Sequence, residues 1–343
     1  MASRRVTHRD VARRAGVSPA VVSYVINNGP RAASAEARAR VLEAIDELDY
    51  HPHAFARGLR SQRTYTVGFI ACDYSPLDVF VSPYSAGVLT GLAAELKDHG
   101  YYLLVHPLGI GEDLTAIGKL LRSGRLDGVV VRLVDATPAS DELLELIALA
   151  RLPCVCVERP VARRGVGAVL FDNDHGAHTA TSFLVSRGHR RIGHLARDPL
   201  YESARSRRLG YERALREAGI GVDPRLVQGG SWDPLTVEAA VWQLFGLAEP
   251  PTAIFAANDS LAFRAVEVLR TRGVRIPEDV AIVGFDDIPL AQEMSPPLTT
   301  VRIPLAEIGR RAAAQVRRLI DAEQLGTGQV DLVPAELVQR STA

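Results

Sequence analysis

Residues 7–27 have the sequence THRDVARRAGVSPAVVSYVIN, and this stretch decides the architecture of the amino-terminal part of the chain. Thr7 followed three residues later by Asp10 resembles a capping box that begins a helix, with Asp replacing the usual Glu. Gly16 is expected to end that helix, because a left-handed residue is favoured at this position. Ser18 then caps a second helix, whose first position is taken by Pro19. The four signals together predict a helix-turn-helix.

Apolar residues recur at helical spacing through this segment and predict its core. The first helix offers Val11, Ala12 and Ala15, and the second offers Val21, Val22, Val25 and Ile26. Ser34 is expected to cap a third helix that runs to about residue 48 and points Val41, Leu42, Ile45 and Leu48 inward. A small helical bundle without a ligand is the alternative interpretation.

The basic charge is concentrated at the same end of the chain. Residues 1–63 hold eleven Arg and six acidic residues, whereas the remaining 280 residues carry a small acidic excess, so the net charge of zero hides a polarised molecule. A basic amino-terminal segment suits the neutralisation of DNA phosphates and predicts salt-sensitive binding. Charge alone supports this interpretation without deciding it.

Residues 6–60 closely resemble the amino-terminal module of the lac repressor family of bacterial regulators. The similarity continues in order through DN (172–173), RGHRRI (187–192), ND (258–259), VGFDD (283–287) and PLTTV (297–301). The resemblance implies a homodimeric transcriptional regulator, most simply a repressor, that binds a pseudo-palindromic operator under the control of a small sugar-like effector. The absence of a heptad tail after residue 337 favours a dimer over a tetramer.

Residues 51–63 follow as a short segment, HPHAFARGLRSQR, that is marginal as an isolated helix. The resemblance implies a hinge helix that folds on DNA, with Leu59 wedged into the minor groove beside Ala56. His53 stands where the family usually has Asn, and Gly58 weakens the helix by up to ~1 kcal/mol relative to Ala. An ordinary linker is the alternative.

The resemblance also assigns the DNA contacts by position. Pro19, Ala20 and Tyr24 fall on the positions used for base edges, although none of them can make the standard bidentate contacts. The phosphate-positioning and hinge candidates are Thr7, Ser18, Ser23, Asn27, Arg31, His53, Ala56, Arg57 and Leu59. These assignments divide the chain into a DNA-binding domain over residues 1–50, a hinge and linker over 51–63, and an effector-binding and dimerisation domain over 64–343.

Residues 64–343 alternate short apolar runs with helical segments, which predicts parallel sheets covered by helices on both faces. We expect strands at 66–72, 102–106, 128–131, 154–157, 191–196, 252–256 and 280–285, and helices at 85–99, 141–151, 175–187, 205–218, 260–272 and 305–321. The family fold is a two-lobed α/β body like a periplasmic binding protein. Its N-lobe is expected to cover about 64–160 and 292–325, and its C-lobe about 161–291 and 326–343.

Ligands of such sheets bind at the carboxyl ends of the strands. This rule selects Asp73, Tyr74, Arg132, Glu158, Asn258 and Asp286, and the family motifs add Arg207 and Trp232. Carboxylates and guanidinium groups beside an aromatic face suit a polyol. Asp259 is expected to cap the helix beginning at residue 260 instead of binding the effector.

Arg132 leaves the charge of the effector open. It is able to recognise an acidic or phosphorylated sugar, or simply to pair with Glu158. The sequence also leaves open whether the effector acts as an inducer, which releases the protein from DNA, or as a corepressor. Release is the commoner outcome for sugar effectors in the family.

Other functional classes find little support in the sequence. We expect no catalytic residues, cofactor or metal, because the chain lacks a Gly-x-Ser-x-Gly elbow, a phosphate-binding loop and a His-Glu-x-x-His motif. Cys72, Cys154 and Cys156 are expected to be buried reduced thiols. A secreted solute-binding protein is the remaining rival, but the amino terminus has no apolar export segment. The prediction is a cytoplasmic protein associated with the nucleoid through its operator, without a membrane span.

Overall fold

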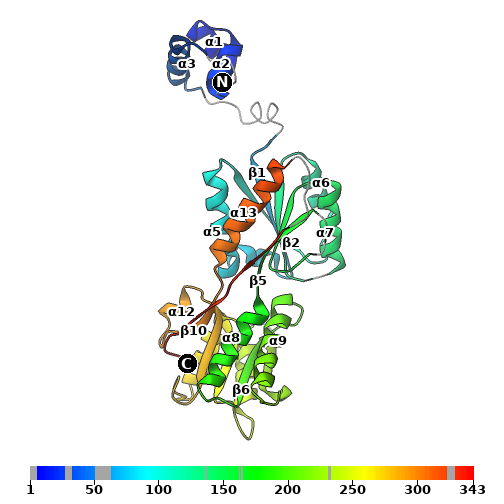
Figure 1. Cartoon of the computed structure of the whole chain (residues 1–343), viewed down its shortest axis with the longest axis vertical. Coiled ribbons are helices and arrows are strands. Elements are labelled where there is room, and N and C mark those ends of the chain that lie inside the picture. The colour runs from blue at the N-terminus through cyan, green and yellow to red at the C-terminus, as the bar shows by residue number, and fades with distance from the viewer. Residues whose placement is uncertain are drawn as a thin grey trace. The chain divides into compact units, whose positions relative to one another are not determined.

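The structure is a computed structural model that describes residues 6–27, 33–50, 63–135, 137–161, 163, 165–230, 233–322 and 329–343. The chain divides into two separately packed units, residues 1–64 and 65–343. We call the first the head unit and the second the body. Figure 1 shows the helices of the head unit and the two sheets of the body.

The head unit contains the helices α1 (His8–Ala15), α2 (Pro19–Asn27) and α3 (Ala35–Glu47). The Thr7 backbone N–H donates to the Asp10 carboxylate at 3.0 Å, as a capping box requires. Gly16 ends α1 with a φ of 64°, in the left-handed region. The Ser18 and Ser34 hydroxyls accept from Val21 N and Ala37 N, so both predicted caps are present. The helix-turn-helix is confirmed.

The core of the head unit differs from the prediction at Leu42, and it includes Ala44 and Tyr50, which were not predicted. Its buried apolar side chains are Val11, Ala12, Ala15, Val22, Val25, Val41, Ala44 and Tyr50. Leu42 is 47% exposed instead of pointing inward. The inward position is taken by Ala44, three residues after Val41, as helical periodicity allows.

The body contains two six-stranded sheets, one in each lobe. The sheet of the N-lobe has the order β11-β5-β4-β3-β1-β2, and all of its strand pairs are parallel. Its strands are β1 (Thr66–Asp73), β2 (Tyr102–Gly109), β3 (Gly128–Leu133), β4 (Cys154–Val157), β5 (Val166–Phe171) and β11 (Val330–Val333). Helices α5 (Pro83–Asp98) and α13 (Leu305–Asp321) share one core cluster with this sheet, and α6 (Thr115–Arg122) and α7 (Pro138–Leu149) share another.

The sheet of the C-lobe has the order β12-β10-β9-β8-β6-β7, with β12 antiparallel to β10. Its strands are β6 (Ile192–Arg197), β7 (Val227–Gly230), β8 (Ala253–Ala256), β9 (Ala281–Asp286), β10 (Thr299–Arg302) and β12 (Glu336–Val338). Helices α8 (Asn173–Ser186) and α9 (Glu202–Glu217) pack in one core cluster, and α10 (Pro234–Phe245) and α11 (Asp259–Arg270) in another. The described residues also form three short helical segments: η1 (Pro76–Phe80), η2 (Pro224–Leu226) and α12 (Leu290–Glu293).

The chain passes between the lobes later than the sequence predicts. The predicted passages lie near residues 160, 290 and 325. In the structure β5 still belongs to the N-lobe sheet, so the first passage falls between residues 171 and 173 (Figure 1). The second falls between β10 and α13, and the third between β11 and β12. The lobe boundaries at 160/161, 291/292 and 325/326 were therefore wrong by about ten residues.

The two-lobed α/β body with parallel sheets is otherwise confirmed. The three cysteines lie buried on β1 and β4 and are free thiols. Among the residues described, no helix is both long and apolar enough to cross a bilayer.

Candidate functional site

A cavity of about 280 Å³ lies within the body and is lined by both lobes. The strand ends that the sequence selected contribute Asp73, Arg132, Glu158, Asn258 and Asp286 to its wall, and Arg207 of α9 joins them. The remaining lining residues are Val81, Ser82, Pro83, Tyr84, Phe171, Asn173, Arg197, Ser203, Ser260, Ile288 and Ile303. The cavity thus combines charged and hydrogen-bonding groups with an extensive apolar surface.

The N-lobe wall contains a buried group of three charged side chains. Arg132 of β3 donates from Nε to Glu158 Oε2 at 2.6 Å and from Nη1 to Asp73 Oδ2 at 2.7 Å. The three side chains are each no more than 6% exposed. Tyr84 lies against the guanidinium group, which is 5.2 Å from the ring centroid. Arg132 is thus held between two carboxylates, and pairing with Glu158 is what the structure shows.

The electrostatics of this triad follow from its burial. Burial alone lowers the pKa of Arg132, but the Glu158 and Asp73 carboxylates outweigh that effect and raise the pKa above its ordinary value. Burial also raises the pKa of the Tyr84 phenol, so the ring carries a neutral hydroxyl at the cavity wall. The triad thus places one guanidinium group between two carboxyl groups, all three buried.

The C-lobe wall is organised around Arg207. Its Nε donates to Asn173 Oδ1 at 2.8 Å, its Nη1 donates to the Ala257 carbonyl, and its Nη2 lies 3.2 Å from Asp286 Oδ1. The guanidinium group also stacks on the Phe285 ring at 3.8 Å from the centroid. These four contacts fix the orientation of Arg207 on α9.

Asp286 ends β9 with a backbone conformation that few side chains adopt. Its φ of 112° lies in the region that normally favours glycine. Burial raises the pKa of Asp286, and Arg207 partly offsets that rise. Strain of this kind is typical of functional positions.

The amino terminus of α11 corrects one expectation. Asn258, not Asp259, is the N-cap, since its Oδ1 accepts from Leu261 N at 2.9 Å. Asp259 lies inside the first turn and accepts from Ile288 N, while the Thr300 hydroxyl donates to its other oxygen. Burial raises the pKa of Asp259 to about 8, with a further contribution from the charge of Asp286. Asp259 therefore joins α11 to the loop after β9 and to β10.

Two predicted effector residues are not among the residues lining this cavity. Tyr74 follows β1 but its hydroxyl donates to Asp135 at 3.2 Å, at the margin of the lobes. Trp232 lies outside the described residues. Conversely, Arg197 and Tyr84 line the cavity but were not predicted from the sequence. Arg197 ends β6, so the strand-end rule was able to find it, whereas Tyr84 lies on a helix and carried no such signal.

The charges of the cavity wall balance. Three carboxylates and three guanidinium groups line it: Asp73, Glu158 and Asp286, and Arg132, Arg197 and Arg207. Among the described residues, no cluster of three or more side chains has the make-up of a metal site. Groups of this kind form paired hydrogen bonds with hydroxyls, which is chemistry suited to a polyhydroxylated ligand.

The head unit presents some of its candidate DNA contacts to solvent. Thr7, Ser18, Pro19 and Ala20 are exposed, while Ser23 and Tyr24 are partly buried. The backbone of Asn27 ends α2. Arg31 and the hinge candidates His53, Ala56, Arg57 and Leu59 lie outside the described residues.

Comparison with known proteins decides the family. The family model described as bacterial regulatory proteins of the lacI family matches residues 7–53, and a periplasmic binding protein-like domain matches residues 181–343. The chain is 33% identical to the HTH-type transcriptional repressor PurR of Vibrio atlanticus (strain LGP32) over 98% of both proteins. It is 35% identical to the HTH-type transcriptional regulator GalR of Escherichia coli (strain K12), covering 93% of this chain and 90% of GalR. The chain belongs to the lacI family.

Solved structures agree with this lacI-family membership. A transcriptional regulator CelR–cellobiose complex is 31% identical, with a TM-score of 0.73 and coverage of 99% of this chain and 100% of that one. A lac repressor dimer bound to operator and the anti-inducer ONPF has a TM-score of 0.83 at 22% identity, covering 99% of each chain, and supports the fold. This lacI-family protein is a DNA-binding transcriptional regulator, and its relatives are regulators, not enzymes, as the sequence predicts.

Proposed function

We propose that the chain is a homodimeric repressor whose affinity for a pseudo-palindromic operator is controlled by a neutral, sugar-like effector in the cavity of the body. One observation carries the proposal: both lobes line the cavity with charges that balance. A ligand that contacts both walls ties the lobes together. Ligand binding is then coupled to the arrangement of the lobes.

The state of Arg132 favours a neutral effector over an anionic one. Its Nε and Nη1 already donate to Glu158 and Asp73, and all three side chains are buried. A phosphate or carboxylate brought to this wall meets two carboxylates beside the one cation. Hydroxyl groups, in contrast, are able to donate to Asp73 and Glu158 and to accept from guanidinium groups. The CelR relative, solved as a cellobiose complex, adds support from a protein of 31% identity.

The expected DNA contacts follow from the head unit. Ala20 is exposed and suits a thymine methyl group, and Tyr24 offers one hydroxyl. Thr7 and Ser18 suit phosphate positioning, and the hinge Leu59 suits a minor-groove wedge. One recognition helix contacts few bases, so two heads on a dimeric body are required for a specific operator. The protein would then act in the cytoplasm, on the DNA that it regulates.

We propose that the effector acts as an inducer, which releases the protein from its operator. A corepressor is the alternative. Coupling of this kind is typically ~1–3 kcal/mol and is reciprocal between the two ligands.

A thermal-shift screen of the full-length protein tests the effector class. The panel holds neutral sugars, including cellobiose, and anionic counterparts such as sugar phosphates and sugar acids. We expect stabilisation by a neutral sugar, reaching about 2.7 kcal/mol at a hundred times its Kd. Arg207→Lys should abolish most of that shift, because lysine cannot reproduce the several directed contacts of the guanidinium group.

The matched control is Arg225→Lys, because Arg225 is exposed and pairs with the nearby Asp223. This variant should respond to the sugar as the wild type does. Stabilisation by anionic sugars alone would overturn the proposed effector class.

A further inference from the structure

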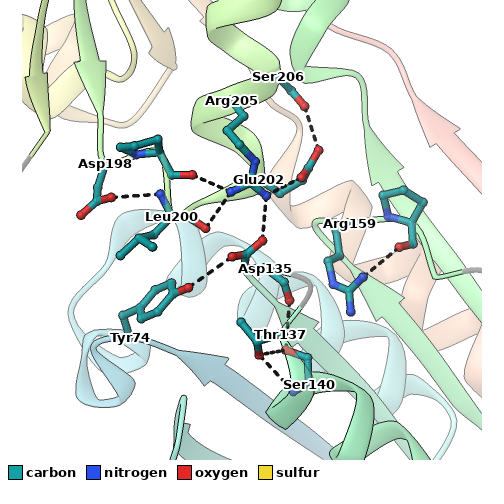
Figure 2. Close-up of polar contacts among 12 residues, drawn as sticks. Tyr74, Asp135, Thr137, Ser140, Arg159, Asp198, Leu200, Glu202, Arg205 and Ser206 are labelled. Carbon is teal, nitrogen blue, oxygen red and sulfur yellow. Dashed lines mark hydrogen bonds and ion pairs between the residues drawn. The ribbon is translucent and has the colours of Figure 1, made fainter.

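The two lobes touch at the margin of the cavity through a second set of side chains. Figure 2 shows Asp135, which follows β3 of the N-lobe, between Tyr74 and Arg205. Arg205 Nη2 lies 2.7 Å from Asp135 Oδ1, and the Tyr74 hydroxyl donates to Asp135 Oδ2 at 3.2 Å. Arg205 belongs to α9 of the C-lobe, so this ion pair crosses from one lobe to the other.

Arg205 is anchored on its own side by several contacts. Its guanidinium group donates to the Pro199 and Leu200 carbonyls and to Glu202 Oε2, the last at 2.7 Å (Figure 2). Asp135 therefore meets a guanidinium group that is already oriented.

A backbone hydrogen bond crosses the lobes at the same place. Glu202 N donates to the Val134 carbonyl oxygen at 3.0 Å. Glu202 is the first residue of α9, and N–H groups in the first turn of a helix have no acceptor within the helix. The protection of this amide thus depends on the other lobe.

Apolar packing closes the contact. Val134 of the N-lobe is buried with Tyr201 and Ala204 of the C-lobe in one small cluster. The Tyr74 and Tyr201 rings meet edge to face, with their centroids 5.4 Å apart. The contact is therefore partly dry, and the exposed fraction of the Asp135 side chain is 14%.

Tyr201 connects this contact to the cavity. Its hydroxyl donates to Asp73 Oδ1 at 3.2 Å, while Asp73 Oδ2 accepts from Arg132. The Arg197 guanidinium group, which lines the cavity, lies 3.5 Å from the Tyr201 ring centroid. A cavity carboxylate is thus held from the opposite lobe by a residue that is not among those lining the cavity.

We propose that Tyr74, Asp135, Tyr201 and Arg205 form an inter-lobe clamp that holds the two lobes together on one side of the cavity and positions Asp73. When only a fraction of the protein molecules is in the binding-competent state, the apparent affinity for a ligand is reduced by that fraction. The clamp sets this fraction through residues other than those that line the cavity. This proposal rests on the proposed function only because it assumes that the cavity binds a ligand. The test of the clamp requires no ligand.

Hydrogen exchange of the full-length protein tests the clamp by changing one lobe and measuring the other. Asp135→Asn and Tyr74→Phe alter the N-lobe side only. The readout is the exchange rate of the Glu202 amide, resolved in peptides covering residues 198–206. We expect exchange to be several-fold faster in Asp135→Asn and to a smaller extent in Tyr74→Phe, because each change weakens a contact that keeps the amide bonded to Val134.

Asp113→Asn is the matched control, because Asp113 is a carboxylate of the same lobe whose side chain accepts, within the described part of the chain, from its near neighbour Thr115. This variant should leave the Glu202 amide unchanged. Salt adds a second readout: it should speed exchange of the Glu202 amide in the wild type and in Asp113→Asn, and should lose that effect in Asp135→Asn.

Tyr74→Phe keeps the ring and removes one hydroxyl, so it preserves the fold if Asp135→Asn does not. Wild-type exchange rates at Glu202 in the folded variants would overturn the clamp while leaving the proposed effector and operator untouched.

Discussion

Replacing Arg132 by alanine tests whether the N-lobe triad is a structural unit or an open anion receptor. The change leaves Asp73 and Glu158 facing the same space without their cation, at side-chain exposures of 6% and 5%. Removing one partner of a buried ion pair costs about 3–5 kcal/mol, because the remaining charge stays buried and uncompensated. For a body of this size each kcal/mol lost from the free energy of unfolding lowers Tm by roughly 2–4 °C, so we expect Tm to fall by roughly 10 °C.

The assay is thermal and urea unfolding of the full-length protein, followed by circular dichroism. Arg213→Ala is the matched control, because Arg213 pairs with Asp174 where both side chains are about 40% exposed. Such exposed pairs contribute no more than about 1 kcal/mol. A triple variant, Arg132→Met with Asp73→Asn and Glu158→Gln, removes all three charges and should recover more than half of the loss. The reasoning is refuted if Arg132→Ala is as stable as the Arg213→Ala control.

Three further changes probe the C-lobe and the hinge. Gly210→Ala should destabilise the protein by about 1–3 kcal/mol in urea unfolding, because its Cβ would overlap the Asp174 carbonyl oxygen of α8, whereas Gly221→Ala meets open space and should be neutral. The pKa of Asp259 is about 8, against about 3.9 when unfolded, so the folded state binds more protons between these values and the free energy of unfolding falls as pH rises. Asp259→Asn should remove a slope of up to about 1.4 kcal/mol per pH unit, measured by urea unfolding from pH 5 to 8. Leu59→Ala should weaken operator binding about tenfold, equivalent to about 1.4 kcal/mol, in a fluorescence anisotropy titration.

Each of these changes has its own contrary outcome. Equal stabilities for the two glycine variants would mean that α8 and α9 are not in close contact. An unchanged pH slope in Asp259→Asn would show that this carboxyl group is ionised throughout the range. Leu42 is exposed on α3, and Leu42→Ala is the control for the hinge variant. Equal operator affinities for Leu42→Ala and Leu59→Ala would show that Leu59 does not act as a minor-groove wedge.

The parts of the fold that sequence predicted are those with local signals. Gly16, Ser18 and Ser34 define the ends of the head-unit helices through their own backbone and side-chain chemistry. The buried strand β4 is a continuous apolar run, and β1 and β3 are apolar runs that reach a charged residue near their carboxyl ends, Asp73 and Arg132. Helix-capping residues and buried apolar runs are both local features of the sequence, and at these elements they agree with the tertiary structure.

Two strands of the N-lobe sheet were missed, for different reasons. β5 is a fully buried apolar run, VGAVLF, and the signal that found β1 and β4 was present there but was not used. β11 lies at a sheet edge and exposes Val330 and Leu332, so its pattern alternates over only four residues. Missing β5 and β11 moved the first and third predicted lobe boundaries, and missing β10, a strand of the C-lobe sheet, moved the second.

The site followed from the strand-end rule more than from any single residue. Asp73, Arg132, Glu158 and Asp286 line the cavity because parallel strands end at one edge of each sheet. The pairing of Arg132 with Asp73 and Glu158 was not predictable, since it depends on the order β4-β3-β1 of the strands in the sheet. Tyr74 shows the same limit: it follows β1, yet its partner is Asp135.

The central claim is that a ligand held in the body changes the affinity of the head for DNA. Its most direct measurement is the Kd of the full-length protein for a duplex enriched from a random library, with and without a saturating neutral sugar found by the thermal-shift screen. We predict a pseudo-palindromic duplex and a Kd that changes about 5- to 150-fold, with the sugar affinity changed by the same factor when DNA is bound. An identical Kd in the presence and absence of the saturating sugar would contradict the account.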